Sequence, residues 1–173
     1  MKKYLMIILL VSIFYSCASN KVVNQLKFDE KANAEILYGT CDLNGLKNAP
    51  FSEWYQSEFD DYQPDMDVLC KIESNGGLAE LNISIVMGTW CSDSRREVPR
   101  FFKIFNMLSY EANRIKIFCV DTKKQAEGTP VSVMNIERVP TFIFFKDKTE
   151  SGRIIETPES SLEGDILNIL ENL

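Results

Sequence analysis

The sequence predicts an α/β fold whose central sheet has both parallel and antiparallel strands. Three largely apolar runs, 81–87, 114–120 and 141–145, are typical of buried strands. Apolar residues at helical spacing lie between the first two runs, and a further helix is predicted at 162–173. The order strand, helix, strand, then two strands and a helix indicates one parallel pair with antiparallel neighbours.

The first sixteen residues are expected to be a signal peptide rather than part of the fold. Lys2 and Lys3 precede an apolar run over 4–14, which is too short for a membrane-spanning helix and has the length of a secretory core segment. The small residue before Cys17 resembles the lipobox of a bacterial lipoprotein. We therefore expect acylation of Cys17 and export to the cell envelope or periplasm. An ordinary signal peptide and an uncleaved anchor are the alternatives.

Composition limits the chemistry of the chain. Its 173 residues, 45% hydrophobic and 25% charged, are typical of one globular domain with a short appendage. The absence of histidine excludes a Ser-His-Asp triad and histidine-ligated zinc. Removing residues 1–16 takes away two lysines and no acidic residue, so the net charge changes from −6 to −8. This acidity argues against nucleic-acid binding. We expect no metal or cofactor, and membrane association only through a lipid on Cys17.

The N-terminal third contains two expected regions. Residues 17–34 are polar and aperiodic, so we expect a flexible tether. Residues 35–77 are expected to form an N-terminal extension that packs on the following domain. This extension contains a short strand and two helices, of which one follows Pro50 and the other runs from Pro64 to Gly76.

The main domain is expected over 78–173. A short strand over 153–155 follows Gly152, and Ser160 with Glu163 offers the last helix a capping box. The apolar face of that helix contains Leu162, Ile166, Ile169, Leu170 and Leu173. The apolar face of the helix after the first buried strand contains Val98, Phe101, Phe102, Phe105 and Leu108.

The segment Gly88–Ser94 contains the strongest candidate for chemistry. Trp90 and Cys91 lie between the end of a predicted strand and the start of a predicted helix. Backbone N–H groups at a helix start favour a thiolate, and two arginines one turn later add positive charge, whereas Asp93 opposes this effect. Ser94 cannot close an internal disulfide with Cys91. It fits an S-x-x-E capping box, and it also allows a mixed disulfide to persist.

These residues resemble the thioredoxin-like superfamily. Trp90 precedes Cys91, Pro99 lies eight residues beyond that cysteine, and Val139–Thr141 precedes an apolar strand, as in the cis-proline motif of the family. The resemblance covers about 78–173 and implies a three-layer sandwich around the mixed sheet. It also implies a cis peptide bond whose exposed backbone pairs with substrate. The substrate-binding residues that it implies are Val139, Pro140 and Thr141.

The chain departs from the thioredoxin pattern at two positions. Ser94 stands where the family has its second cysteine, and Ile85 stands where the family has a buried acid that helps to deprotonate that cysteine. The two departures are chemically consistent with each other, because an acid that helps to deprotonate the second cysteine has no role when that cysteine is absent. The extension over 35–77 resembles the one in envelope thioredoxin-like lipoproteins of Bacteroidetes-type bacteria.

We therefore expect an exported protein that performs thiol–disulfide exchange through Cys91 alone, with mixed disulfides to protein or small-molecule thiols. Trp90 would shape the rim of the site, and Asp93 and Ser94 would tune the thiol. The alternative is a redox-inactive peptide-binding module on the same fold. A peroxidase is less well supported, because Gly88 stands where peroxiredoxins have a threonine.

The other cysteines are expected to be outside the chemistry. Cys119 is predicted to be a small core residue at the end of its strand, although a role as a distant resolving thiol is the alternative. Cys41 is predicted to lie near a turn, and Cys70 on an apolar helical face. Their pairing stays open, because spacing does not determine disulfide connectivity.

Overall fold

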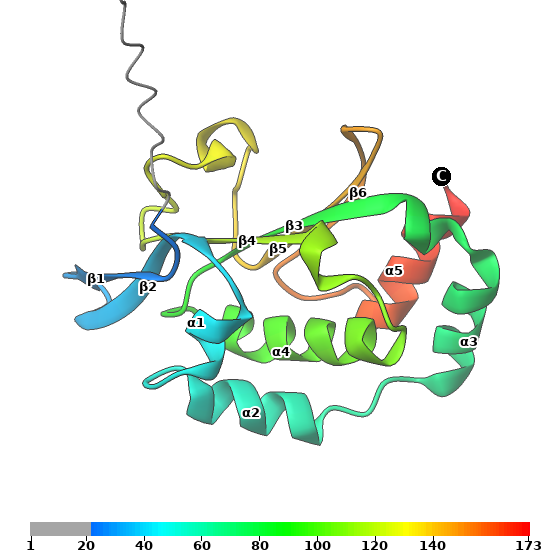
Figure 1. Cartoon of the computed structure of the whole chain (residues 1–173), viewed down its shortest axis with the longest axis horizontal. Helices are drawn as coiled ribbons and strands as arrows, with labels where there is room; N and C mark the ends of the chain where they lie inside the picture. The colour runs from blue at the N-terminus through cyan, green and yellow to red at the C-terminus, as the bar shows by residue number, and fades with distance from the viewer. Residues whose placement is uncertain (1–21) are drawn as a thin grey trace, which may run out of the picture.

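The computed structural model describes residues 22–173, so the expected signal peptide over 1–16 and Cys17 lie outside the described residues. The centre of this part is a six-stranded sheet (Figure 1). Side chains from its five α-helices join one core on one face of the sheet. The second face is covered by the segment 120–139, which contains the short 3₁₀ helix Pro130–Val133.

The strand order confirms the predicted mixed sheet. The order is β1-β2-β4-β3-β5-β6, in which β3 and β4 run parallel and all the other neighbouring pairs are antiparallel. The helix between β3 and β4 supplies the crossover that a parallel pair requires. The strands are β1 (Gln25–Asp29), β2 (Ala34–Cys41), β3 (Leu81–Met87), β4 (Ile115–Cys119), β5 (Thr141–Lys146) and β6 (Thr149–Ile155).

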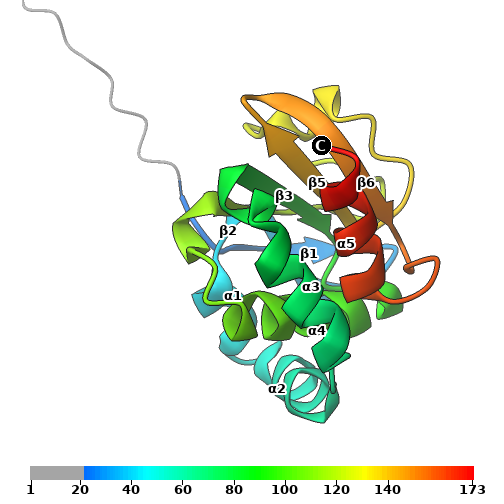
Figure 2. The same ribbon diagram turned by 90° about the vertical axis from the view of Figure 1, so that its right-hand side faces the viewer.

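The helices form two groups on the helical side of the sheet. They are α1 (Leu43–Lys47), α2 (Ser52–Asp61), α3 (Met66–Asn75), α4 (Ser92–Met107) and α5 (Leu162–Glu171). In Figure 1 α2 lies beneath α4, whereas Figure 2 shows α3 next to α5. Helix α3 begins two residues after Pro64, because the side chain of Asp65 caps it by accepting from the backbone N–H groups of Asp67 and Val68.

A stack of aromatic rings connects α4 to the sheet. Phe101 of α4 is fully buried, and its ring centroid lies 4.2 Å from that of Phe105 and 4.5 Å from that of Phe142 in β5. Such offset stacking stabilises a core beyond the area that it buries. The aromatic residues of α4 therefore present an apolar face to the sheet and hold the helix against β5.

Strand β3 is buried on both faces, as its continuous apolar sequence predicts. Ile83, Ile85 and Met87 face the helices, whereas Val86 faces the opposite core. Ile85 is fully buried at the position where the thioredoxin pattern has an acid. The interior beneath the candidate site is therefore apolar at this position.

The described part of the expected tether is not a flexible linker. Within 17–34, residues 25–29 form β1 and pair with β2. Polar bonds anchor the hairpin: the buried carboxylate of Asp29 accepts from the backbone N–H of Thr122 at 2.9 Å, and Lys27 Nζ lies 3.0 Å from Asp121. The sequence prediction missed this strand because it depended on apolar periodicity, whereas the hairpin is anchored by charged side chains.

Replacing Asp29 with asparagine is expected to destabilise the fold at pH 7 by about 1–3 kcal/mol, the cost of weakening buried hydrogen bonds. The backbone N–H of Thr122, followed by that of Ala32, lowers the pKa of the Asp29 carboxyl in the folded state. The stabilisation is therefore complete above the unfolded pKa, about 3.9, and is lost as pH falls through the folded pKa.

Urea unfolding of the wild type and of Asp29→Asn at pH 7 and at pH 3 measures this effect. The difference in unfolding free energy should shrink at the lower pH. Asp147→Asn, at an exposed turn, is the matched control and should change stability by less than about 0.5 kcal/mol. An equal Asp29→Asn effect at both pH values would contradict the ionic origin.

The predicted capping box of α5 is wrong. The N-cap is Ser161 instead of Ser160, and its hydroxyl accepts from the backbone N–H of Gly164 at 3.1 Å. Glu163 is buried and accepts from the hydroxyl of Tyr62 at 2.7 Å. This carboxylate therefore joins α5 to the segment after α2, a long-range contact that the local pattern does not reveal.

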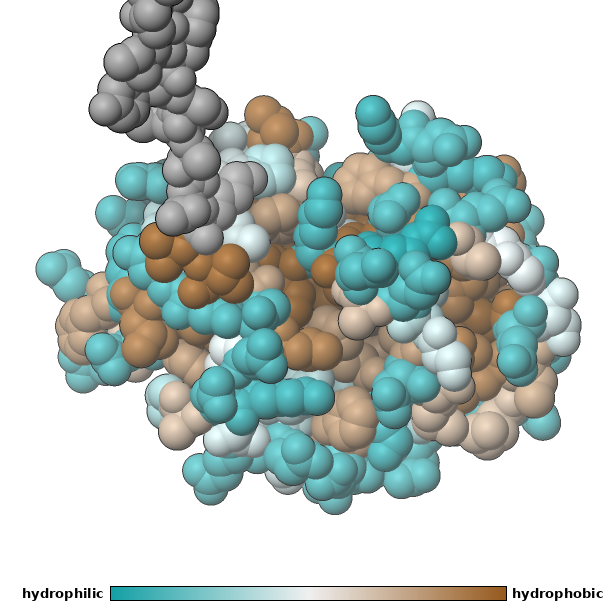
Figure 3. All heavy atoms as spheres, in the orientation of Figure 1, coloured by the Kyte–Doolittle hydropathy of each residue, from teal (hydrophilic) through white to brown (hydrophobic). Residues whose placement is uncertain are grey.

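The surface of the described residues is mainly hydrophilic in the view of Figure 3, with apolar patches between the charged side chains. Val22 and Val23, where the described chain begins, are exposed, as is Phe28 on the β1–β2 hairpin. None of the helices within 22–173 has the length and the apolar character that crossing a membrane requires.

Candidate active site around Cys91

Cys91 lies at the first turn of α4, where β3 ends and the chain reverses. Its backbone N–H donates to the carbonyl of Gly88 at 2.9 Å, and its own carbonyl accepts from the N–H of Arg95 at 3.0 Å. Cys91 is therefore the N-cap residue, with an extended backbone and no side-chain capping bond. The half-buried thiol is thus held beside the free N–H groups of a sixteen-residue helix.

The loop before β5 lies beside the Cys91 thiol. The peptide bond between Val139 and Pro140 is cis, which confirms the expected motif. The thiol of Cys91 donates to the carbonyl of Val139, with 3.2 Å between sulfur and oxygen. Thr141 is buried at the start of β5, and its hydroxyl donates to the carbonyl of Arg138 at 2.7 Å, which fixes the loop. The structure thus brings Val139, Pro140 and Cys91 together.

Ser94 is fully buried one turn into α4, and it does not cap the helix. Its hydroxyl oxygen accepts from the backbone N–H of Gly88 at 3.2 Å. The predicted S-x-x-E capping box is therefore wrong, because the Ser94 hydroxyl joins the end of β3 to α4 instead. This contact fixes the turn that carries Cys91.

Trp90 forms part of the rim beside the thiol. Its indole N–H donates to the carbonyl of Val120 at 2.9 Å, which orients the ring across the end of β4. A Cβ atom at position 88 would lie 2.5 Å from the indole nitrogen, so the close packing of Trp90 requires glycine at Gly88. The sequence predicted this rim position but not the partner at Val120.

The charged residues after Cys91 bind one another. Asp93 pairs with Arg96 at 2.9 Å, and Arg96 also binds Glu97 at 2.6 Å. These carboxylates, Glu97 first, raise the pKa of the Arg96 guanidinium. Arg95 donates from Nε to the carbonyl of Thr89 at 2.6 Å. The two arginines therefore stabilise the turn and the acidic side chains around it, and neither pairs directly with the sulfur.

The remaining described cysteines are free thiols in different surroundings. Cys119 is completely buried, as predicted for a core residue, and burial raises the pKa of its thiol well above the usual value, with Cys41 as a further cause. Cys41 is also buried. Cys70 is exposed on α3 instead of lying on an apolar face. Within 22–173, no group of three or more potential ligand residues is placed to hold a metal ion.

A basic pocket beside Trp90 is the part of the surroundings that sequence reasoning missed. Its cationic residues are Lys31, Arg95 and Lys124, which come from the β1–β2 turn, from α4 and from the loop after β4. No sequence signal indicates this pocket, because its residues are far apart along the chain and come together only when the hairpin docks.

No protein-family model and no curated protein matches the sequence. Solved structures similar to it include a protein of unknown function from Pseudomonas aeruginosa, with a TM-score of 0.48 and 14% identity over 69% of this chain and 81% of that chain. Fasciola hepatica thioredoxin has a TM-score of 0.39 and 20% identity, over 62% and 92%. Thioredoxin O2 from Arabidopsis thaliana has a TM-score of 0.37 and 18% identity, over 60% and 88%.

The strand order and the local geometry agree with the fold that the sequence predicted. A parallel β3–α4–β4 unit is followed by the antiparallel strands β5 and β6 and by the terminal helix α5. A cysteine opens the helix after the central strand, and a cis-proline loop contacts its sulfur. The chain therefore has a thioredoxin-like α/β fold.

Proposed function

We propose that this protein is a monothiol thiol:disulfide oxidoreductase that acts through Cys91. The observation that carries the proposal is the contact between the Cys91 thiol and the carbonyl of Val139, at 3.2 Å, at the start of α4. This arrangement places one half-buried sulfur between the free N–H groups at a helix N-terminus and the backbone of the cis-proline loop.

The reaction proceeds by exchange without net oxidation. The Cys91 thiol loses its proton, and the thiolate attacks one sulfur of a substrate disulfide. A bond forms between Cys91 and that sulfur, the substrate S–S bond breaks, and the second sulfur departs as a thiolate that takes up a proton. A further thiol then attacks the substrate sulfur of the mixed disulfide, which releases Cys91 as a thiolate.

The backbone of Val139 supports the binding of a substrate strand. In the resting protein the Val139 carbonyl accepts from the Cys91 thiol. Once Cys91 is deprotonated or bonded to substrate, this donor is gone, so the carbonyl becomes available to a substrate N–H. A strand that pairs here gains main-chain hydrogen bonds whatever its side chains are.

Within residues 22–173, no second thiol is placed to resolve the mixed disulfide. Ser94 carries a hydroxyl, and that hydroxyl is already bound to Gly88. Cys119 is completely buried, and its raised pKa keeps it protonated. A mixed disulfide at Cys91 therefore waits for a second thiol from the substrate or from a small molecule. We propose further that this chemistry takes place in the cell envelope, with a lipid on Cys17 as the membrane anchor.

The test is a disulfide-trapping experiment in a Cys70→Ser background, which removes the exposed competing thiol. Incubation with an aromatic disulfide should give one adduct that peptide mapping places at Cys91 and that dithiothreitol reverses. Cys91→Ser in the same background should give no adduct within the main domain. An adduct of equal yield without Cys91 would overturn the proposal, and the absence of any adduct would favour a redox-inactive peptide-binding module.

A further inference from the structure

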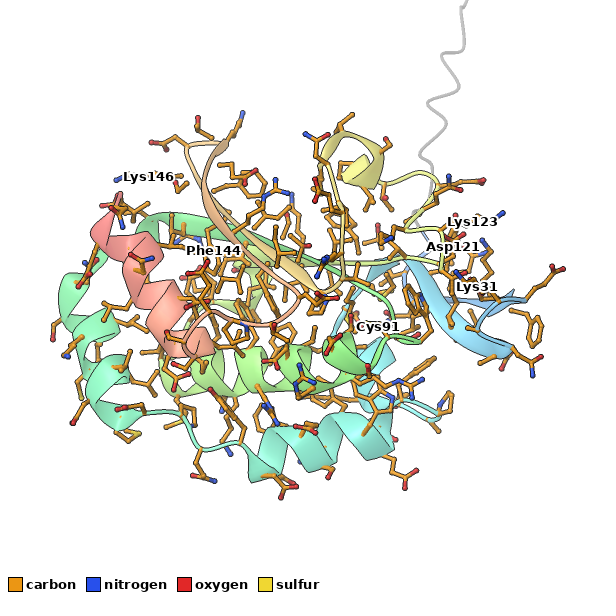
Figure 4. The ribbon with its side chains drawn as sticks, turned by 180° about the vertical axis from the view of Figure 1, so that it is seen from behind. Lys31, Cys91, Asp121, Lys123, Phe144 and Lys146 are labelled. Atoms are coloured by element: carbon orange, nitrogen blue, oxygen red, sulfur yellow. The ribbon has the colours of Figure 1, made fainter. Side chains whose placement is uncertain are left out.

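A pocket of about 370 Å³ lies against Trp90, the residue directly before Cys91. Three separate segments form its walls. The β1–β2 turn contributes Lys31, α4 and the turn before it contribute Arg95 and Trp90, and the loop after β4 contributes Lys124. Figure 4 shows Lys31 and the neighbouring Lys123 and Asp121 at the same end of the molecule as Cys91.

The pocket is cationic although the protein is acidic, with a net charge of −6. Among residues 22–173, Lys31, Arg95 and Lys124 form no ion pair with a carboxylate. Six other described basic residues do form such pairs: Lys27, Arg96, Arg100, Arg138, Lys146 and Arg153. Unpaired cations that share one cavity attract an anion more strongly than isolated surface charges do.

Two carboxylates in the segments that form the pocket, Asp29 and Asp121, are already bound. Asp29 accepts from the backbone N–H and the hydroxyl of Thr122, at 2.9 Å and 3.0 Å, and is itself buried. Asp121 pairs with Lys27 and accepts the backbone N–H of Lys123, each at 3.0 Å. These contacts hold the hairpin and the loop together. They leave the ammonium groups of the lining lysines as the groups available to a ligand.

We infer that this pocket binds a carboxylate group of the thiol or disulfide compound that reacts at Cys91. The inference rests on the proposed function, because it names the substrate class of that same thiol. The lysines and Arg95 would hold the carboxylate, and the indole of Trp90 would contact the apolar part that links it to the sulfur. A pocket of this volume accommodates a small dicarboxylate disulfide, and the carboxylates of an acidic peptide share the same chemistry.

The experiment compares two aromatic disulfides in the Cys70→Ser protein: the dianion dithiobis(nitrobenzoate) and the uncharged dithiodipyridine. The rate constant for reaction at Cys91 is measured for each, with and without the double substitution Lys31→Gln and Lys124→Gln. We expect the anionic probe to react about tenfold more slowly with the variant, while the neutral probe is unaffected. Raising the ionic strength should reduce the difference.

The matched control is the double substitution Lys71→Gln and Lys148→Gln, which changes the net charge equally at exposed positions away from the pocket. It should leave both rates unchanged. An equal loss of the anionic rate in this control would show a net-charge effect and overturn the pocket. An equal loss for both probes in the pocket variant would also overturn it, because the lysines would then act on the sulfur and not on the ligand.

Direct binding separates failure of the pocket from failure of the proposed function. Nitrobenzoate has the carboxylate but no disulfide. It should shift the NMR resonance of the Trp90 indole N–H in the wild type, but not in the variant with Lys31→Gln and Lys124→Gln. This shift without any reaction at Cys91 would support the pocket and reject the exchange chemistry. Reaction without the shift would reject the pocket. A glutamate-flanked peptide disulfide with a stronger lysine dependence than the small probe would identify the carboxylate source as a protein.

Discussion

Replacing Ser94 with cysteine is expected to shorten the lifetime of a mixed disulfide at Cys91 by about a thousandfold. The new thiol would lie one helical turn from Cys91, at an effective concentration of the order of millimolar, whereas resolution of the wild-type adduct depends on added thiol at about micromolar concentration. The variant should also form an internal disulfide on oxidation, with a mass lower by two hydrogens. Stopped-flow release of the probe thiol measures the lifetime, and mass spectrometry measures the disulfide.

Ser92→Cys provides the control for this prediction. Position 92 is exposed and adjacent to Cys91 along the helix, so its side chain points to a different face from that of Ser94. The control therefore adds a thiol near Cys91 in the sequence, but on a different face of α4 from position 94. If both variants release the probe at the wild-type rate, the adduct is not limited by the missing thiol, and the single-thiol account of this site fails.

Replacing Phe101 with alanine is expected to destabilise the protein by about 3–5 kcal/mol, the cost of removing a fully buried aromatic ring. Phe101 is completely buried and stacks on Phe105 and Phe142, so the cavity would open between α4 and β5. Neighbouring rings fill such a space only in part. Urea unfolding followed by circular dichroism measures the loss, which is read at the midpoint and in the extrapolated free energy.

The control for the core prediction is the same substitution at an exposed ring. Phe28 on the β1–β2 hairpin is 57% exposed, and Phe28→Ala should change the unfolding free energy by less than about 0.5 kcal/mol. Equal losses at positions 28 and 101 would mean that the stacked rings between α4 and β5 do not dominate the core. The position of α4, and with it that of Cys91, would then depend on other contacts.

Local sequence patterns predicted the strands and helices whose buried positions follow a regular spacing along the chain. β3 is apolar at consecutive positions because both of its faces are covered, and α4 repeats its aromatic residues at helical spacing because one face meets the sheet. The cis peptide bond at Pro140 was expected from the resemblance of Val139–Thr141 to a known motif, and the structure has it. Each of these features is encoded within a short stretch of chain.

Polar long-range contacts account for the features that the sequence prediction missed. The residues of β1 were expected to belong to a tether because they show no apolar periodicity. In the structure the strand is anchored by Asp29 and Lys27 instead of by a buried apolar face. Ser161 displaced the expected cap of α5, since Glu163 bonds to Tyr62 instead of to its own helix. A hydrogen bond between distant segments leaves no periodic signal, so spacing alone does not reveal it.

The chemistry of the site divides in the same way. That one cysteine opens a helix, with serine where a second cysteine would stand, is a property of seven consecutive residues, and no folding is needed to see it. The carbonyl of Val139 beside the sulfur, the burial of Cys119 and the cations around Trp90 exist only because β4, β5 and the N-terminal hairpin meet at one end of the sheet. Bond geometry restricts neighbours along the chain, whereas contacts between remote segments depend on how the whole core packs.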